Sequence, residues 1–138
     1  MRPDAETLLK EAEKARLNSY APYSGFTVGA ALLAGDGRLF TGCNMENAAF
    51  TPGICAERAA VYKAVSEGVR DFECIAIAGG RKNEPADSPC PPCGVCRQVL
   101  REFCDPGTFT VIIRDSAGKP SERTLGELLP ESFGPDNL

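Results

Sequence analysis

The feature that most constrains the fold is an apolar run, Phe72–Ala78, which lies between two stretches with helical periodicity. A run of this kind has no polar side to present to water, so it predicts a strand buried on both faces of a sheet. Apolar residues recur at helical spacing before the run, up to Glu67, and after it, over residues 93–103. Strands joined by helices of this length imply a largely parallel sheet with helices packed on its faces.

The rest of the chain supplies further elements and no sign of a second domain or an internal repeat, so we expect one domain over residues 1–138. Thr51 and Pro52 are expected as the N-cap and first turn of the helix that Gly68 ends. The other expected elements are a helix over residues 4–17, a hairpin of strands 26–33 and 38–43, a strand over 108–114 and a short helix over 124–129.

The composition and the sequence pattern narrow the function. The chain has no histidine, which excludes Ser-His, Cys-His and His-metal chemistry. Its net charge of −4 gives no basic footprint for a nucleic acid, and no apolar run is long enough to span a membrane. Seven cysteines accompany a start without a secretory signal, so we expect a cytoplasmic protein whose cysteines bind metal or act in catalysis.

Three cysteines form the candidate metal centre. Cys93 and Cys96 lie three apart at the start of a predicted helix, so their sulfurs share one face. Cys55 lies in the first turn of the preceding predicted helix, and successive right-handed crossovers bring two helix N-termini to one edge of the sheet. Three thiolates could then hold one zinc ion and leave a fourth position for water, as catalytic zinc sites require. A redox pair or unused thiols is the alternative that the spacing leaves open.

Glu57 and Arg58 follow the first of these cysteines. The Glu57 side chain can reach a site over the tip of its helix, where a carboxylate beside the metal would shuttle protons. Three thiolates leave a zinc site with excess negative charge, which Arg58 and the two helix N-termini would offset. On spacing alone, a glutamate in the first turn, such as Glu57, is usually just a favourable helix-dipole residue, and Arg58 could equally be a surface residue.

Four segments cover most of residues 20–104 in an order that matches a known family: Tyr20-Ala-Pro-Tyr-Ser-Gly-Phe-x-Val-Gly-Ala-Ala-Leu32, Asn44-x-Glu-Asn-Ala48, Gly53-Ile-Cys-Ala-Glu-Arg58 and Cys93-Gly-x-Cys-Arg-Gln98. Through these segments the sequence resembles the zinc-dependent cytidine/deoxycytidylate deaminase superfamily, and most closely its small homotetrameric cytidine deaminases. The three-cysteine zinc signature of such deaminases is a known pattern. The resemblance implies a three-layer α/β/α fold in which a mixed five-stranded sheet carries helices on both faces.

The same resemblance implies the chemistry. Cys55, Cys93 and Cys96 would hold one zinc ion per subunit, with Glu57 as the proton carrier and Arg58 bonded to the thiolates. A zinc-bound hydroxide would attack C4 of cytidine or deoxycytidine, giving uridine or deoxyuridine in pyrimidine salvage.

The resemblance also assigns the substrate contacts. Asn44 and Glu46 would bind the ribose hydroxyls, Phe26 would pack beside the base, and the Ala56 backbone would meet its Watson–Crick edge. Without the resemblance, ordinary turn and cap chemistry would be the preferred explanation of Asn44 and Glu46. A carboxylate at Glu46 would repel a 5′-phosphate, so free nucleosides are expected as substrates.

The family's quaternary structure implies further contacts. We expect a homotetramer in which neighbouring subunits complete each active site, and Phe50 and Phe133 are the candidates for these contacts across the interface. Phe133 stands out as an aromatic side chain in an otherwise polar tail.

Two alternative functions stay open, and the first arises because Cys90 departs from the family's sequence pattern. Cys90, Cys93 and Cys96 form a CxxCxxC run, so a fourth sulfur could close the zinc site and make the chain a non-catalytic four-cysteine zinc-binding module. The second alternative is a deaminase of another aminopyrimidine such as blasticidin S, which the sugar-binding run from Asn44 disfavours.

Overall fold

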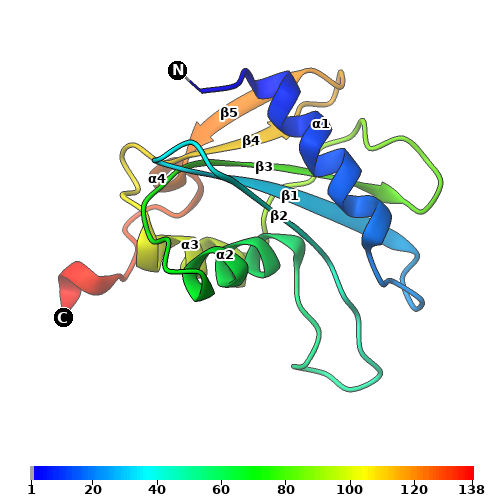
Figure 1. Ribbon diagram of the computed structural model, residues 1–138, viewed down its shortest axis with the longest axis horizontal. Coiled ribbons are helices and arrows are strands. Elements are labelled where there is room, and N and C mark those ends of the chain that lie inside the picture. Colours follow the sequence, from blue (N-terminus) through cyan, green and yellow to red (C-terminus); the bar gives the residue numbers. More distant parts are fainter. Residues whose placement is uncertain (1) are drawn as a thin grey trace.

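One mixed five-stranded sheet organises the computed structural model, which describes residues 2–138 (Figure 1). The strands lie in the order β2-β1-β3-β4-β5, with bounds β1 Phe26–Ala34, β2 Leu39–Cys43, β3 Phe72–Arg81, β4 Thr110–Arg114 and β5 Pro120–Thr124. The prediction of a largely parallel sheet is wrong, because β1 runs antiparallel to both of its neighbours and β5 runs antiparallel to β4. Of these four pairings, β3 with β4 is the parallel one.

The helices lie on both faces of this sheet, as the three-layer expectation requires (Figure 1). Helix α1 packs on one face, and α2, α3 and α4 pack on the other. Their bounds are α1 Ala5–Ala15, α2 Ala56–Ser66, α3 Gly94–Phe103 and α4 Leu125–Leu128, with 3₁₀ turns at Arg16–Asn18 and Pro135–Asn137. No helix within residues 2–138 combines the length and apolar character needed to cross a membrane.

Strand β3 is buried on both faces, as its apolar sequence predicts. Ile75 and Ile77 belong to the core beneath α2 and α3, whereas Cys74 and Ala76 belong to the core beneath α1. This alternation follows from the two-residue period of a strand. It explains why a mixed sheet can still contain a central strand without a polar side.

The topology brings the first turns of α2 and α3 together. Strands β2, β3 and β4 all run in the same direction, because β1 is antiparallel to both β2 and β3 and β3 is parallel to β4. The connections β2-α2-β3 and β3-α3-β4 are therefore parallel crossovers. Right-handed crossovers place both helices on one face and start both at the same edge of the sheet. The expected convergence thus holds although the sheet is mixed.

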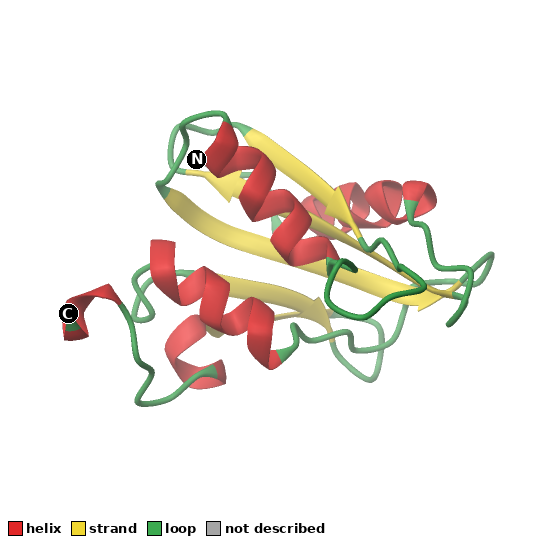
Figure 2. Cartoon of the chain, turned by 90° about the horizontal axis from the view of Figure 1, so that it is seen from below, coloured by secondary structure: helices red, strands yellow, loops and turns green. Residues whose placement is uncertain are grey.

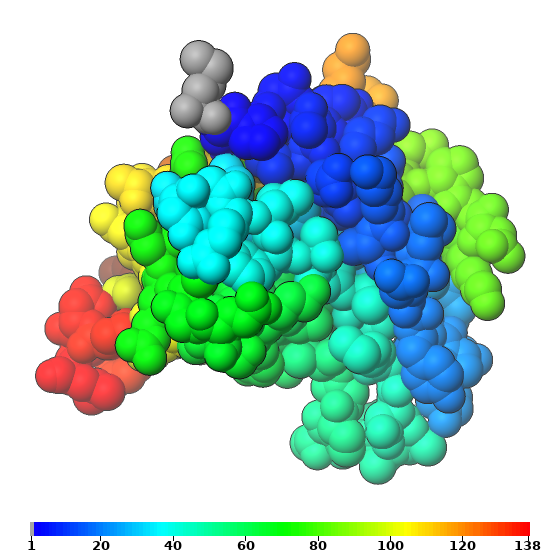
Figure 3. All heavy atoms as spheres, viewed as in Figure 1, coloured from blue at the N-terminus to red at the C-terminus, as the bar shows by residue number. Residues whose placement is uncertain are grey.

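Helix α2 begins later than its sequence predicts. Cys55 is its N-cap, and the assignment of Thr51 and Pro52 as cap and first turn is wrong. Thr51 has a φ of 83°, and Ile54 exchanges two backbone hydrogen bonds with Met45, which keeps the chain extended up to Cys55. Residues 45–53 consequently form a lobe that projects from the body of the molecule (Figure 3).

Arg114, the last residue of β4, connects α1 to the sheet. The residue is 5% exposed, and its guanidinium donates hydrogen bonds to the Glu6 and Glu13 carboxylates and to the Gly118 carbonyl. We expect Arg114→Met to lower the free energy of unfolding by about 2 kcal/mol, less than for a fully buried pair because both carboxylates are partly exposed. Urea unfolding measures the loss, and the exposed Arg123→Met serves as the control. Equal stability of the two variants would contradict this role.

The Arg114 contribution should depend on pH in a defined direction. Hydrogen bonding to Arg114 lowers the pKa of Glu6 below its usual value. A lowered folded-state pKa stabilises the fold above the unfolded pKa, and the stabilisation is lost as the pH falls through the folded value. The stability difference between wild type and Arg114→Met should therefore shrink in urea titrations below pH ~4. A difference that grows on acidification would contradict the assignment.

Candidate active site

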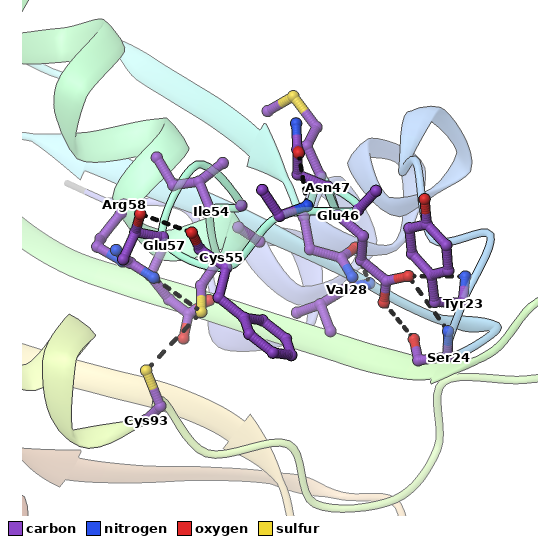
Figure 4. A pocket seen from close by; sticks show the side chains of 18 of the residues that line it. Tyr23, Ser24, Val28, Glu46, Asn47, Ile54, Cys55, Glu57, Arg58 and Cys93 are labelled. Carbon is purple, nitrogen blue, oxygen red and sulfur yellow. Dashed lines mark hydrogen bonds between the residues drawn. The ribbon is translucent and has the colours of Figure 1, made fainter.

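Three thiols meet at the starts of α2 and α3. The Sγ atoms of Cys55, Cys93 and Cys96 all lie within 4.8 Å of one another, and the Cys55 and Cys93 sulfurs are 3.8 Å apart (Figure 4). A tetrahedral zinc ion with Zn–S bonds of ~2.3 Å places its sulfurs ~3.8 Å apart. The cluster therefore fits one zinc ion held by three cysteines.

The local backbone explains why these thiols are available. Cys55 and Cys93 are the N-caps of α2 and α3, and neither side chain makes a capping hydrogen bond to its helix. Cys96 follows in the first turn of α3 and is fully buried. Both helices direct the positive ends of their dipoles at the thiols, which stabilises negative charge there.

Arg58 provides a further positive charge. Its Nη2 donates to the Cys55 sulfur at 3.5 Å, and its Nε is buried without a hydrogen-bond partner among the described residues. Hydrogen bonds from Cys96, Arg58 and Cys93, in that order, lower the pKa of Cys55 to about 5. The pKa of Cys96 is raised, chiefly by its hydrogen bond to Cys55. One thiolate is thus formed readily at neutral pH, as metal binding requires.

Glu57 lies beside the thiols without belonging to their cluster. It is 4% exposed, lines the same pocket as Cys55 and Cys93, and is placed by the first turn of α2 (Figure 4). Burial, and secondarily the charge of Cys55, raises the pKa of the Glu57 carboxyl to about 7. A carboxyl with such a pKa can both accept and donate a proton near neutral pH.

Asn44 and Glu46 line the other end of the pocket, on the chain that leaves β2. The Asn44 amide bridges two backbone groups of β1: its Oδ1 accepts from Val28 N and its Nδ2 donates to Phe26 O, each at 2.9 Å. These two hydrogen bonds hold Asn44 against β1 and so fix the position at which the lobe over residues 45–53 begins. Both Oδ1 and Nδ2 of Asn44 can still form one more hydrogen bond each.

Glu46 is held by a turn that the sequence analysis did not connect with it. The backbone N–H groups of Tyr23 and Ser24 donate to Oε1, and the Ser24 hydroxyl donates to Oε2 (Figure 4). These bonds, the Ser24 hydroxyl first, lower the pKa of Glu46 and keep it ionised. The signal in the sequence was the run of turn-forming residues before Phe26, but the spacing alone does not reveal its partner.

Of the two remaining predicted substrate contacts, Ala56 lines the pocket and Phe26 lies just outside it. Ala56 lines the pocket and its side chain is fully buried. Phe26 does not line the pocket itself, is 41% exposed, and lies beside Val28 and Cys90, which do. Its packing beside a base stays a prediction.

Phe50 and Phe133 lie on different parts of the surface. Phe50 is 96% exposed on the lobe at the pocket rim. Phe133 is 60% exposed in the C-terminal segment, which lies at one end of the molecule, away from the lobe (Figures 1 and 2). Gln98 and Arg101 of α3 hold that segment through the Phe133 carbonyl, the Ser132 hydroxyl and the Asp136 carboxylate.

Cys90 lines the pocket but is not a member of the three-sulfur cluster. Burial raises the pKa of its thiol to about 11, which keeps it protonated. We therefore expect Cys90→Ser to bind as much zinc as wild type, measured by atomic absorption on dialysed protein. A loss of half or more of the metal would instead favour the four-cysteine module.

Comparison with known protein families gives a match over most of the chain. The model of the cytidine and deoxycytidylate deaminase zinc-binding region matches residues 2–112. A cytidine deaminase of Sporosarcina psychrophila is 46% identical over 135 residues, covering 98% of this chain and 95% of that protein. One of Halalkalibacterium halodurans is 45% identical, with 98% of each chain covered.

Solved structures agree with the sequence comparison. The crystal structure of a cytidine deaminase from Burkholderia pseudomallei superposes with a TM-score of 0.84 at 41% identity, covering 95% of this chain and all of that one. The structure of a cytidine deaminase from Mycobacterium tuberculosis gives a TM-score of 0.78 at 39% identity, covering 96% and 98%. The five-stranded sheet and its helix layers are thus shared with proteins of one enzymatic class.

Proposed function

This chain belongs to the cytidine and deoxycytidylate deaminase family, and from that premise we propose how its own residues carry out the reaction. It is a zinc-dependent enzyme that hydrolyses cytidine and deoxycytidine to uridine and deoxyuridine. The observation that carries the proposal is the three-thiol cluster at one end of a pocket, with the buried Glu57 carboxyl beside it. The alternatives, a blasticidin deaminase and a four-cysteine zinc module, are not favoured by the comparisons.

The metal centre consists of the three clustered cysteines. Cys55, Cys93 and Cys96 would hold one zinc ion per subunit. When bound, zinc supplies Lewis acidity that makes a water molecule nucleophilic towards C4 of the pyrimidine. Arg58 and the helix N-termini offset the negative charge of the thiolates, so that the site is not left with a large excess charge.

Glu57 moves the protons. It removes one proton from the attacking water as the C4–O bond forms and delivers that proton to N3 of the ring. It then takes the proton of the hydroxyl now on C4 and delivers it to the amino group, so that ammonia leaves as the C4–N bond breaks and the C4=O bond forms. Its burial excludes competing water, and its place in the first turn of α2 holds it next to the thiols.

The other end of the pocket binds the sugar. Asn44 and Glu46 each keep free hydrogen-bonding capacity while being fixed by Phe26, Val28, Tyr23 and Ser24. We assign the ribose hydroxyls to them, the Watson–Crick edge of the base to the Ala56 backbone, and the side of the base to Phe26. The ionised Glu46 repels a 5′-phosphate, so nucleosides are preferred over nucleotides.

A substrate panel tests this function. The uridine formed from cytidine is separated by chromatography and quantified in the presence of deoxycytidine, cytosine, CMP or blasticidin S as competitors. We expect deoxycytidine to compete at concentrations similar to cytidine, and cytosine, CMP and blasticidin S to compete at least ~100-fold more weakly, because each loses sugar contacts or adds a repelled or misfitting group. Stronger inhibition by blasticidin S or CMP than by deoxycytidine would overturn the assignment of the sugar end.

We further propose a homotetramer in which Phe50 and Phe133 contact a neighbouring subunit's site. The large exposed aromatic side chain at the pocket rim and the open pocket around it support this arrangement. Light scattering should give the mass of four chains. Mixed tetramers of Glu57→Gln and Phe133→Ala subunits should exceed the summed activity of the parents, because each supplies what the other lacks. No gain on mixing would contradict the contribution across the interface.

We propose the cytoplasm as the place of action. The three clustered thiols must stay reduced to bind zinc, and all seven cysteines of the chain are free. A fluorescent fusion checked by cell fractionation tests the assignment, which an exported, disulfide-bonded form would contradict.

A further inference from the structure

A small apolar wall borders the pocket between its two polar ends. It consists of the side chains of Phe26, Val28 and Cys90, and of these Val28 and Cys90 line the pocket. Val28 lies between the thiol cluster and the Ser24–Glu46 pair (Figure 4). The wall therefore borders the space that a pyrimidine ring must occupy if its sugar is at Glu46 and its C4 is at the thiols.

Gly79 lies directly behind this wall. It pairs with Val28 across strands β1 and β3, on the same face of the sheet. A Cβ atom at Gly79 would lie 2.7 Å from the Cys90 sulfur and 3.1 Å from both Phe26 Cε2 and Val28 Cγ2. These separations are shorter than van der Waals contact. The missing side chain at Gly79 thus makes the recess into which the Cys90 sulfur fits.

The chemistry of the pyrimidine decides which side of it meets the wall. Its Watson–Crick edge carries O2 and N3, which require hydrogen-bonding partners that Phe26, Val28 and a buried thiol supply poorly. The opposite edge carries only the C5–H and C6–H groups and is apolar. Burial next to the wall therefore favours the C5–C6 edge.

We propose that Cys90, seated in the recess over Gly79, is a specificity-determining residue that sets the room for a substituent at C5 of the cytosine ring. The inference rests on the proposed function, since it requires the ribose at Glu46 and C4 at the thiols. It assigns to Cys90 a steric role in substrate choice in place of a metal or redox role. Cytosine nucleosides with a 5-methyl or larger 5-substituent are the substrate class that this residue screens.

The test compares kcat/KM for cytidine and 5-methylcytidine in wild type, Cys90→Ala, Gly79→Ala and the double variant. Cys90→Ala should raise the 5-methylcytidine to cytidine ratio by about tenfold, because one methyl group in an apolar pocket is worth at least that factor. Gly79→Ala should raise KM for cytidine about tenfold and lower kcat less, because the displaced sulfur narrows the pocket. The double variant should recover most of this loss, since the sulfur, the nearest of the three atoms that the new Cβ meets, is gone.

Two matched controls separate packing from specificity. Cys104→Ala removes another buried thiol, and Gly107→Ala adds a methyl group to a loop near only the Asp105 carboxylate. Both should leave the substrate ratio unchanged. Circular dichroism and zinc content verify that each variant folds.

The outcomes distinguish this inference from the proposed function. An unaltered substrate ratio in Cys90→Ala, or additive losses in the double variant, would overturn the role of Cys90 while wild-type cytidine turnover still supported the deaminase assignment. Absence of cytidine turnover by the zinc-loaded wild type would instead overturn the proposed function, and this inference with it.

Discussion

Replacing Glu57 by glutamine should lower kcat for cytidine by at least ~10³-fold, because positioned proton transfer contributes up to ~10⁴-fold and the same carboxyl serves several steps of this reaction. Glutamine has the same shape but cannot take up and release a proton at neutral pH. Glu57 is buried and lies outside the three-sulfur cluster, so the variant should keep one zinc ion per chain. Samples quenched at intervals during a long incubation at high enzyme concentration measure the residual rate.

The matched control for this variant is Glu67→Gln, at the exposed C-terminal end of the same helix. It should retain the wild-type rate. Removing a buried carboxylate that costs free energy to ionise should not destabilise the protein, so Glu57→Gln should unfold at the same or a higher urea concentration. A Glu57→Gln rate within tenfold of wild type would contradict its role as the proton carrier.

Removing a metal-binding thiol should have an effect of similar size with a different signature. Cys93→Ala should lose most of its zinc on dialysis and at least ~10³-fold of its activity, because two protein ligands hold catalytic zinc far less well than three. Metal content and turnover are measured on the same sample. Glu57→Gln and Cys93→Ala would thus both be inactive, but only the second would be depleted of zinc.

Two further variants make the Cys93 result interpretable. Cys104→Ala removes a buried thiol of the core and should keep zinc and activity. Cys93→His restores a zinc-binding side chain and should retain more metal than Cys93→Ala, since zinc deaminases also use a His/Cys/Cys set. Equal zinc contents in Cys93→Ala and wild type would remove Cys93 from the ligand set.

The convergence of the thiols could be predicted from sequence because it depends on crossover handedness. Cys55 and Cys93 each precede a helix that follows a strand of the same direction, and right-handed connections bring such helix starts together. This convergence does not depend on β1, whose antiparallel pairing with β3 was not predicted. The short hairpin turn after β1 made β1 and β2 antiparallel, but nothing in the pattern placed β1 between β2 and β3.

Other features lay beyond sequence reasoning for physical reasons. Strand β5, Pro120–Thr124, is a polar edge strand without apolar alternation, so no periodicity marks it. The late start of α2 depends on pairing between Met45 and Ile54, which overrides the local preference of Thr51 and Pro52 for a helix start. The bonds from Ser24 to Glu46 join two loops 22 residues apart, and such contacts depend on tertiary structure alone.

The spacing of Cys90 relative to Cys93 and Cys96 suggests a fourth zinc ligand that the structure does not place in the cluster. The CxxCxxC spacing of Cys90, Cys93 and Cys96 is compatible with a four-sulfur site. In the structure, however, Cys93 is the N-cap of α3 and Cys90 belongs to the preceding loop, where its sulfur fits against Gly79. Of the three cysteines in the run, only Cys93 and Cys96, at the start of α3, have their sulfurs next to that of Cys55 at the start of α2.

Zinc titration of the chelated wild-type protein tests the central claim most directly. Cytidine loss is followed by ultraviolet absorbance while zinc is added back to metal-free protein of known concentration. Activity should be negligible without zinc, rise in proportion to added metal and level off at one zinc ion per chain. Full turnover in the metal-free protein, or metal uptake without any gain in cytidine turnover, would contradict a catalytic zinc site formed by these three cysteines.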